Sequence, residues 1–164
     1  MAEVKVIISG YRAEGLAARL NSAFAEEGRA FMATATEKIL GTWQASSPVD
    51  IGAYRNSQTA SVEVGGSQIT GAVGTPINYG SVLEQGRRAG SRQPPTAALE
   101  GWVARKLGIA DPKTVRSVAF LVARRIGERG LPAKRPLAKA LEENQAFIKQ
   151  LFEVDFAAAI AKRL

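Results

Sequence analysis

The chain has 164 residues and a net charge of +7, with 46% hydrophobic and 23% charged residues, a balance typical of a globular protein with its own core. It contains neither cysteine nor histidine, which excludes disulfides and thiolate metal sites and removes the commonest metal ligand and general base. Any enzyme built from this chain would depend on Asp, Glu, Lys, Tyr or Ser alone.

The apolar runs of the chain are short. The first five residues include an acid, and the apolar run at residues 6–8 is too short for the core of a signal peptide. The longest apolar run, residues 118–123, is far below the roughly 20 residues that span a membrane. We therefore expect a soluble protein that is made in the cytosol and has no membrane contact.

The first 45 residues predict a strand and a long helix. Residues 3–9 alternate loosely between apolar and polar side chains, as in a short strand. Between residues 13 and 45, apolar side chains recur at spacings of three or four residues, which predicts a helix about 45–50 Å long. Such a helix is longer than a small domain can cover, so we expect it to bend near Gly28 or to contact a neighbouring subunit.

A structural corner is predicted after this helix, in the stretch SSPVDIGAYRNS. Pro48 ends the helix because the residue before a proline is pushed out of the α region. Asp50 can bond its own backbone or cap the next turn, and Gly52 supplies a backbone angle that other residues avoid. Arg55 is free to pair with a carboxylate, either Asp50 or Glu84. The residues that we assign to this corner are Pro48, Asp50, Gly52 and Arg55.

A β-hairpin and a series of helices are predicted beyond the corner. Residues 57–64 and 68–74 alternate in polarity, and Gly65-Gly66 between them is a hairpin turn signal. Asp111-Pro112 is a strong helix start and Gly130 a helix stop. The predicted helices cover residues 79–86, 96–107, 112–130 and 136–162. The last of them should bury one apolar stripe, made of Leu137, Leu141, Ile148, Phe152, Phe156 and Ile160.

These elements predict an α+β fold in one domain over residues 1–164. A small antiparallel sheet, made of the hairpin and the N-terminal strand, should pack with the long N-terminal helix and the C-terminal helices. Residues 87–95 read RRAGSRQPP, and their Gly, Pro and Ser content predicts a mobile surface loop.

The positive charge is concentrated in residues 85–135, which hold 12 basic and 3 acidic residues. Three interpretations fit this segment: a solvated basic face, a surface for an acidic protein partner, or a nucleic-acid surface. Arg124 and Arg125 could contact phosphates, but Trp102 and Phe120 lie in helical patterns that favour core positions over base stacking. The interface candidates are Tyr79, Glu84, Arg87, Arg88, Arg92, Arg124 and Arg125.

No motif in the chain predicts catalysis. Val49-Asp50-Ile51-Gly52 is similar to the catalytic loop of retroviral-type aspartic proteases, but that loop has Thr or Ser where Ile51 stands, and the all-β lobe that supports it is missing. Gly71-Ala72-Val73-Gly74 lacks the Lys-Ser/Thr tail of a phosphate loop, and no carboxylates have metal-ligand spacing. We therefore predict a protein without catalytic, cofactor-binding or metal-binding residues.

Three separated segments together resemble one protein family. SSPVDIGAYRNS resembles a Pro-Val-Asp-Thr-Gly-x-Leu-Arg-x-Ser corner, and INYGSVLEQG resembles a Tyr-Ala-x-x-Val-Glu-x-Gly segment. LVARRIGERGLPAKRPLAKAL resembles an Ile-Ala-x-x-Ile-x-x-x-Gly-x-x-x-x-Pro-Phe helix and connector. They are typical of the gene-product-ten-like tail-completion or neck family of lambdoid tailed phages and related prophages. With its long helices, the resemblance covers most of the chain.

Four residues depart from the pattern of that family. Thr, Leu, Ala and Phe are usual at the positions of Ile51, Tyr54, Gly80 and Leu137. We expect these departures to be adjustments of volume or polarity at packing positions. The change at Ile51 puts the family's loop hydrogen bonds in question there, but not the corner itself.

The resemblance implies a virion structural protein that is not an enzyme and needs no cofactor. Such proteins form a ring, commonly a hexamer, between the head connector and the tail tube, and they assemble in the host bacterial cytoplasm. The implied partners are further copies of the chain, a head-connector or head-closure protein, a tail terminator or tail tube protein, and passively the genomic DNA in the lumen. Residues 85–95 would reach an acidic neighbour and become ordered on assembly. The alternatives are a tail terminator that caps the tube and a small basic DNA-binding protein.

Overall fold

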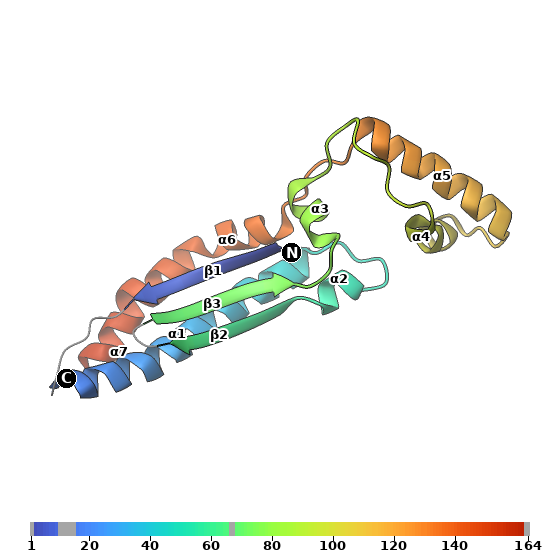
Figure 1. Ribbon diagram of the computed structural model, residues 1–164. Helices are drawn as coiled ribbons and strands as arrows, with labels where there is room; N and C mark the ends of the chain where they lie inside the picture. The colour runs from blue at the N-terminus through green and yellow to red at the C-terminus, as the bar shows by residue number, and fades with distance from the viewer. Residues whose placement is uncertain (1, 10–15, 66–67, 163–164) are drawn as a thin grey trace. The chain divides into compact units, whose positions relative to one another are not determined.

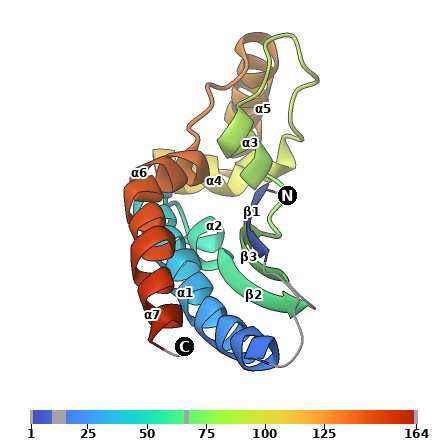
Figure 2. The ribbon, with the colours of Figure 1, turned by 90° about the vertical axis from the view of Figure 1, so that its left-hand side faces the viewer.

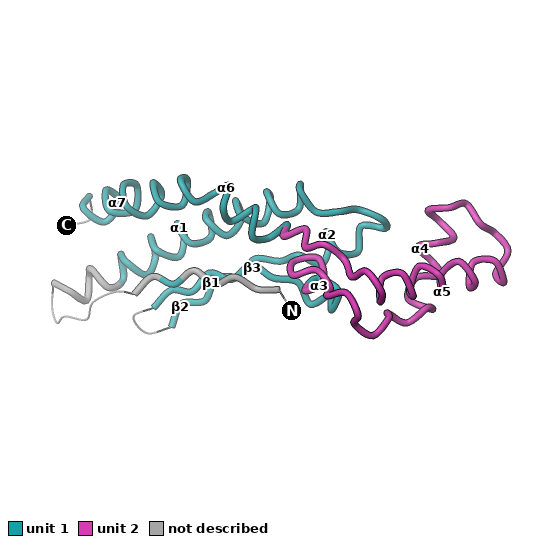
Figure 3. Tube along the Cα trace, turned by 90° about the horizontal axis from the view of Figure 1, so that it is seen from above, with its two compact units in different colours: residues 1–80, 136–164 teal, residues 81–135 magenta. Residues whose placement is uncertain are grey.

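The computed structural model describes residues 2–9, 16–65 and 68–162, which form the predicted α+β fold (Figure 1). The chain divides into two compact units, shown in two colours in Figure 3. Unit 1 comprises residues 1–80 and 136–164, and unit 2 comprises residues 81–135. That the two units belong to a single domain stays a prediction.

Unit 1 contains a three-stranded antiparallel sheet with the strand order β1-β3-β2. The strands are β1 (Ala2–Ser9), β2 (Thr59–Gly65) and β3 (Gln68–Thr75). Val73 of β3 lies opposite Val4 on one side and Ala60 on the other, so the hairpin and the N-terminal strand share β3 as their centre. The sheet prediction is confirmed, whereas the turn residue Gly66 lies outside the described residues.

The long helix α1 (Leu16–Ser46) packs against β2 and β3 and, elsewhere, against the C-terminal helices (Figure 2). Its 31 residues correspond to about 46 Å, as expected from the sequence. It continues through Gly28, where the missing side chain leaves room for Ile69 and Phe156. Helix α1 is therefore covered by elements of its own unit, and its length does not by itself require a neighbouring subunit.

The core of unit 1 lies between α1 and β3. Met32, Ile39 and Trp43 of α1 are almost wholly buried, as are Ile69 and Val73 of β3. Side chains of a strand alternate between its two faces, so β3 turns every second residue towards the helix. The sheet is thereby held at a fixed position on α1.

The C-terminal segment is helical throughout but changes its winding. It comprises α6 (Pro136–Gln150), the π-helix η1 (Leu151–Phe156) and α7 (Ala157–Ala161). The π-helix places more residues in a turn, so the buried stripe shifts: Leu151 is buried, and Phe152 is only half-buried. Asn144 was not part of the predicted buried stripe. Its side chain is buried and donates hydrogen bonds to Thr42 Oγ1 and Ala140 O.

Unit 2 is built around two helices, α4 (Ala97–Leu107) and α5 (Pro112–Arg129), which follow the short α3 (Gly80–Gln85). Asp111 caps α5 by accepting hydrogen bonds from the amide and hydroxyl of Thr114, at 2.8 and 2.5 Å. The core between α4 and α5 is small and consists of Val103, Val115 and Ala119, with Leu99, Ala104, Ile109 and Val118 packed around them. The predicted start and stop of α5 are confirmed.

Candidate assembly interface

The predicted corner between α1 and β2 contains a one-turn helix, α2 (Ala53–Asn56), which the sequence reading missed. Gly52 precedes it with a φ of 78°, so the unusual backbone angle assigned to this glycine is present. Tyr54 is buried, with its ring centroid 5.9 Å from that of Trp43 in an edge-on arrangement. The corner is thus anchored to the core of unit 1 by an aromatic contact.

Hydroxyl and amide side chains hold this corner together. Ser47 Oγ donates to Trp43 O at 2.7 Å and accepts from Gln58 Nε2 at 2.7 Å. Ser57 Oγ and Thr75 Oγ1 share a hydrogen bond of 2.7 Å, which joins the end of α2 to the end of β3. None of these four residues was among the predicted corner residues. The available signal was their position beside the corner, since Ser and Thr bond nearby backbone groups at such turns.

One expectation about the corner needs correction. Arg55 is exposed, and its pairing with Asp50 or with Glu84 stays a prediction. Ile51 is 66% exposed and is not a packing position, whereas Tyr54 and Leu137 are buried as expected.

The predicted mobile loop at residues 87–95 is hydrogen-bonded to the end of α5. The amides of Arg87 and Gly90 donate to Leu131 O and Gly127 O, both at 2.8 Å. Nη2 of Arg87 donates to Arg92 O, and Ser91 Oγ donates to Arg88 O at 2.6 Å. The irregular backbone predicted for this loop is present. Its first half is held in place by backbone hydrogen bonds to residues at the end of α5 and just after it.

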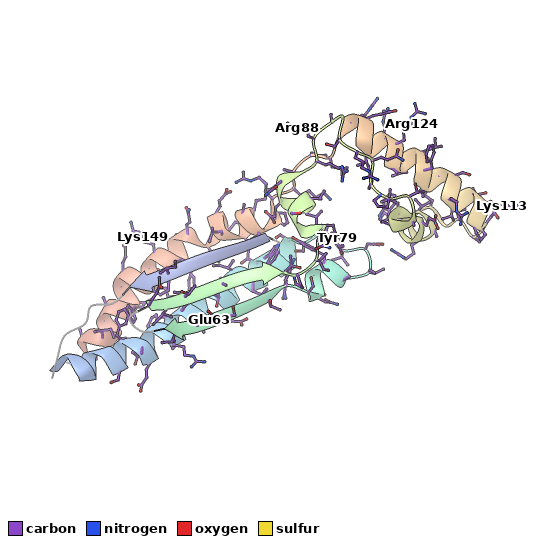
Figure 4. All side chains as sticks on the ribbon, viewed as in Figure 1. Glu63, Tyr79, Arg88, Lys113, Arg124 and Lys149 are labelled. Atoms are coloured by element: carbon purple, nitrogen blue, oxygen red, sulfur yellow. The ribbon has the colours of Figure 1, made fainter. Side chains whose placement is uncertain are left out.

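The interface candidates differ in what they contact. Arg88, Arg92, Arg124 and Arg125 are exposed, and Figure 4 shows Arg88 and Arg124 projecting from unit 2. Arg87 is half-buried, and its Nε is enclosed without a hydrogen-bond partner among the described residues. Arg87 therefore belongs to the structure of the loop, whereas the four exposed arginines are available to a partner.

The two remaining candidates belong to different units. Tyr79 is 49% exposed and lies against Tyr54, with 5.9 Å between the ring centroids. It therefore extends the aromatic contact of the corner to the surface of unit 1. Glu84 of α3 is half-buried.

The charge of the chain is divided between the two units. Residues 81–135 hold 12 of the 22 Lys and Arg residues but only four of the 15 Asp and Glu residues, a net charge of +8. The rest of the chain has a net charge of −1. The basic segment seen in the sequence therefore coincides with one compact unit, in which attraction for a negatively charged surface is concentrated.

Unit 2 also exposes large apolar side chains, among them Trp102 and Phe120, for which the sequence favoured core positions. Phe120 and Leu121 of α5 are 47% and 60% exposed, and Trp102 of α4 is 38% exposed. The inward face of α5 carries Val115, Ala119, Ala123 and Gly127, so small residues occupy the contact with its neighbours. The larger side chains of α5 are consequently left on the outside.

No group of three or more metal-ligating side chains occurs in residues 2–9, 16–65 and 68–162. Within the same ranges, no helix combines the length and the apolar character needed to cross a bilayer. Comparisons with protein families, with curated proteins and with solved structures found no match to this chain.

Proposed function

We propose that this protein is a virion structural protein of a tailed phage or prophage, and that it forms a ring at the joint between head connector and tail tube. The ring assembly in this proposal rests on the resemblance of three sequence segments to the tail-completion or neck family. The observation that carries it is the character of unit 2, which combines a net charge of +8 with the exposed Phe120 and Leu121. Apolar residues rimmed by polar ones are typical of surfaces that bind proteins.

The corner supports the same proposal. Its side-chain hydrogen bonds and the Trp43–Tyr54 contact hold Val49 and Ile51 at the surface, where they are 59% and 66% exposed. A rigid loop with exposed apolar side chains is suited to contact a neighbour without a large loss of conformational entropy. In this proposal the protein is not an enzyme, has no cofactor, and acts in the virion after assembly in the host cytoplasm.

The proposed partners are further copies of the chain, the head-connector or head-closure protein, and the tail terminator or tail tube. A tail terminator at the same joint is the nearest alternative. A small DNA-binding protein is the second candidate function, favoured by the charge of unit 2 and by the exposed Arg124 and Arg125. The exposed apolar pair on α5 favours a protein partner over DNA.

Electron microscopy of the purified protein and of the particle neck tests the proposal. We expect a closed ring in both preparations. The variant Arg88→Glu/Arg92→Glu should fail to enter particles, because both side chains are exposed and their charge is reversed. Arg87 is left unchanged in this variant because its guanidinium binds the Arg92 carbonyl.

The control is Lys139→Glu, which reverses an exposed charge on α6. Particles without this protein in the neck would contradict the proposal. A salt-sensitive gel shift with DNA, in the absence of any ring, would favour the DNA-binding alternative.

A further inference from the structure

A groove on unit 2 combines apolar side chains with the ion pair of Arg116 and Glu100, whose Nε and Oε1 atoms are 3.6 Å apart. It has a volume of about 760 Å³ and lies between α4 and α5, and its lining includes Ala97, Glu100, Arg116, Phe120 and Leu121. Arg116 precedes Phe120 by one helical turn, and Arg124 and Arg125 follow Phe120 and Leu121 by one turn. The exposed apolar pair is therefore flanked by arginines along the helix.

A segment of unit 1 has the complementary character. Val154 is 59% exposed and stands between the exposed acids Glu153 and Asp155 in the π-helix η1. The wide winding of η1 brings Leu151 and Phe156 into the core and leaves these three consecutive residues outside. π-helical turns are frequent at functional sites.

We propose that η1 of one copy docks in the α4–α5 groove of a second copy. Val154 would contact Phe120 and Leu121, and Glu153 and Asp155 would face the arginines that flank them. This inference rests on the proposed function, because it supplies the contact that joins neighbours in the ring. The two surfaces of the contact are different, and such a heterologous contact produces a ring when its rotation closes.

The acids of η1 and the arginines beside the groove have opposite charges, which favours this occupant. Arg116 already pairs with Glu100 at 3.6 Å, Arg124 with Glu128 at 2.8 Å and Glu153 with Lys149 at 3.9 Å. Five of these six side chains are at least half exposed, so the pairs contribute little and can be exchanged. The net charge of +7 on each copy opposes association at long range. At about 0.15 M salt this repulsion is screened beyond roughly 8 Å, so the local contact determines whether two copies associate.

Sedimentation velocity of the full chain tests the proposal, at about 0.15 M salt and at concentrations from about 1 to 100 µM. We expect the average mass of the wild type to increase with concentration. The variants Arg124→Glu/Arg125→Glu and Glu153→Lys/Asp155→Lys should each weaken association by about tenfold or more. Lys139→Glu, at an exposed position outside both surfaces, should associate as the wild type does.

Mixing the two charge-reversed variants gives the sharpest result. The reversed groove then meets a reversed η1, and the unchanged groove meets an unchanged η1, so association should return in the mixture. A misfolded variant could not produce this recovery. Leu121→Ser and Val154→Ser, which keep every charge, should also weaken association and provide a second test if a charge variant fails to fold.

The proposal would be overturned by a wild type that stays monomeric, by charge-reversed variants that associate normally, or by a mixture without recovery. Rings that persist in micrographs of both charge-reversed variants would overturn this contact but leave the proposed function standing. The proposed function fails separately, if the wild-type protein is missing from the particle neck.

Discussion

The backbones of Arg87 and Leu131 exchange two hydrogen bonds, with N–O distances of 2.8 and 2.9 Å. This antiparallel bridge ties the arginine-rich segment to the residues that follow α5. Glycines on both sides make the close approach feasible: Gly86 has a φ of +73° and lies against Leu131, and Gly130 has the same φ and lies against Arg87. The bridge fixes the backbone position of Arg87, the residue that precedes the exposed Arg88 on unit 2.

Gly130→Ala should open this bridge. A Cβ at Gly130 would collide with the Arg87 carbonyl oxygen, and its backbone angles, φ 73° and ψ −167°, are essentially restricted to glycine, at a cost of about 1–3 kcal/mol for other residues. Hydrogen exchange of the Arg87 and Leu131 amides should accelerate by roughly tenfold or more. Gly90→Ala is the matched control, because Gly90 also has a positive φ but no atom within 4 Å of an added Cβ. Equal exchange in both variants would contradict the steric role of Gly130.

Gly71→Ala should destabilise the contact between α1 and β3. An added Cβ would lie 2.6 Å from Met32 Sδ and 2.7 Å from Thr36 Cγ2, and overpacking of this kind costs about 1–3 kcal/mol. Gly41→Ala on the exposed side of α1 meets no atom within 4 Å and should raise stability by about 0.5–1 kcal/mol. Urea unfolding followed by circular dichroism measures both changes. A Gly71→Ala variant that is more stable than the wild type, together with a less stable Gly41→Ala variant, would refute the packing of β3 on α1.

Trp43→Phe should cost far less than Trp43→Ala. Trp43 is fully buried, and its Nε1 has no hydrogen-bond partner among the described residues. Removing that unsatisfied donor recovers about 1–3 kcal/mol of desolvation, which offsets the lost ring volume. We expect Trp43→Phe within about 1 kcal/mol of the wild type, and Trp43→Ala about 3–5 kcal/mol less stable. Similar large losses in both variants would show that the indole N–H is satisfied, for example by a buried water.

The stability of unit 2 should fall in acid through Asp111. Hydrogen bonds from the Thr114 hydroxyl and then from the Thr114 amide lower the pKa of Asp111 below its usual value of 3.8. A lowered folded-state pKa means that this stabilisation is complete above pH 3.8 and is lost as the pH falls through the folded value. Helicity measured between neutral and acid pH should therefore drop less steeply in Asp111→Asn than in the wild type. Thr114→Val, which removes the hydroxyl donor, should give an intermediate slope, and three identical slopes would contradict the cap.

Much of the fold was predictable because its local signals agree with its packing. The polarity of residues 57–64 and 68–74 alternates, and β2 (Thr59–Gly65) and β3 (Gln68–Thr75) lie within two residues of these bounds. Asp111 and Gly130 bound α5 because capping and left-handed backbone are properties of single residues. The unusual angle of Gly52 followed from the same reasoning.

The errors arose where packing overrides a local pattern. Phe120 lies in a regular helical pattern, yet it is exposed because small residues fill the inward face of α5. The buried stripe of the last helix shifts at η1, since a π-turn has no signature in the spacing of apolar residues.

The sequence by itself determined the absence of cysteine and histidine side chains from the chain, the identity and order of its main elements, and the location of its positive charge in one segment. Those properties depend on residue type and short-range spacing. Tertiary structure alone decided that this segment is a compact unit, that the Arg87–Leu131 bridge holds its loop, and that Phe120 and Val154 face outward. These outcomes depend on contacts between residues far apart in the chain, and exposure depends on which surfaces the packing of helices and strands leaves uncovered.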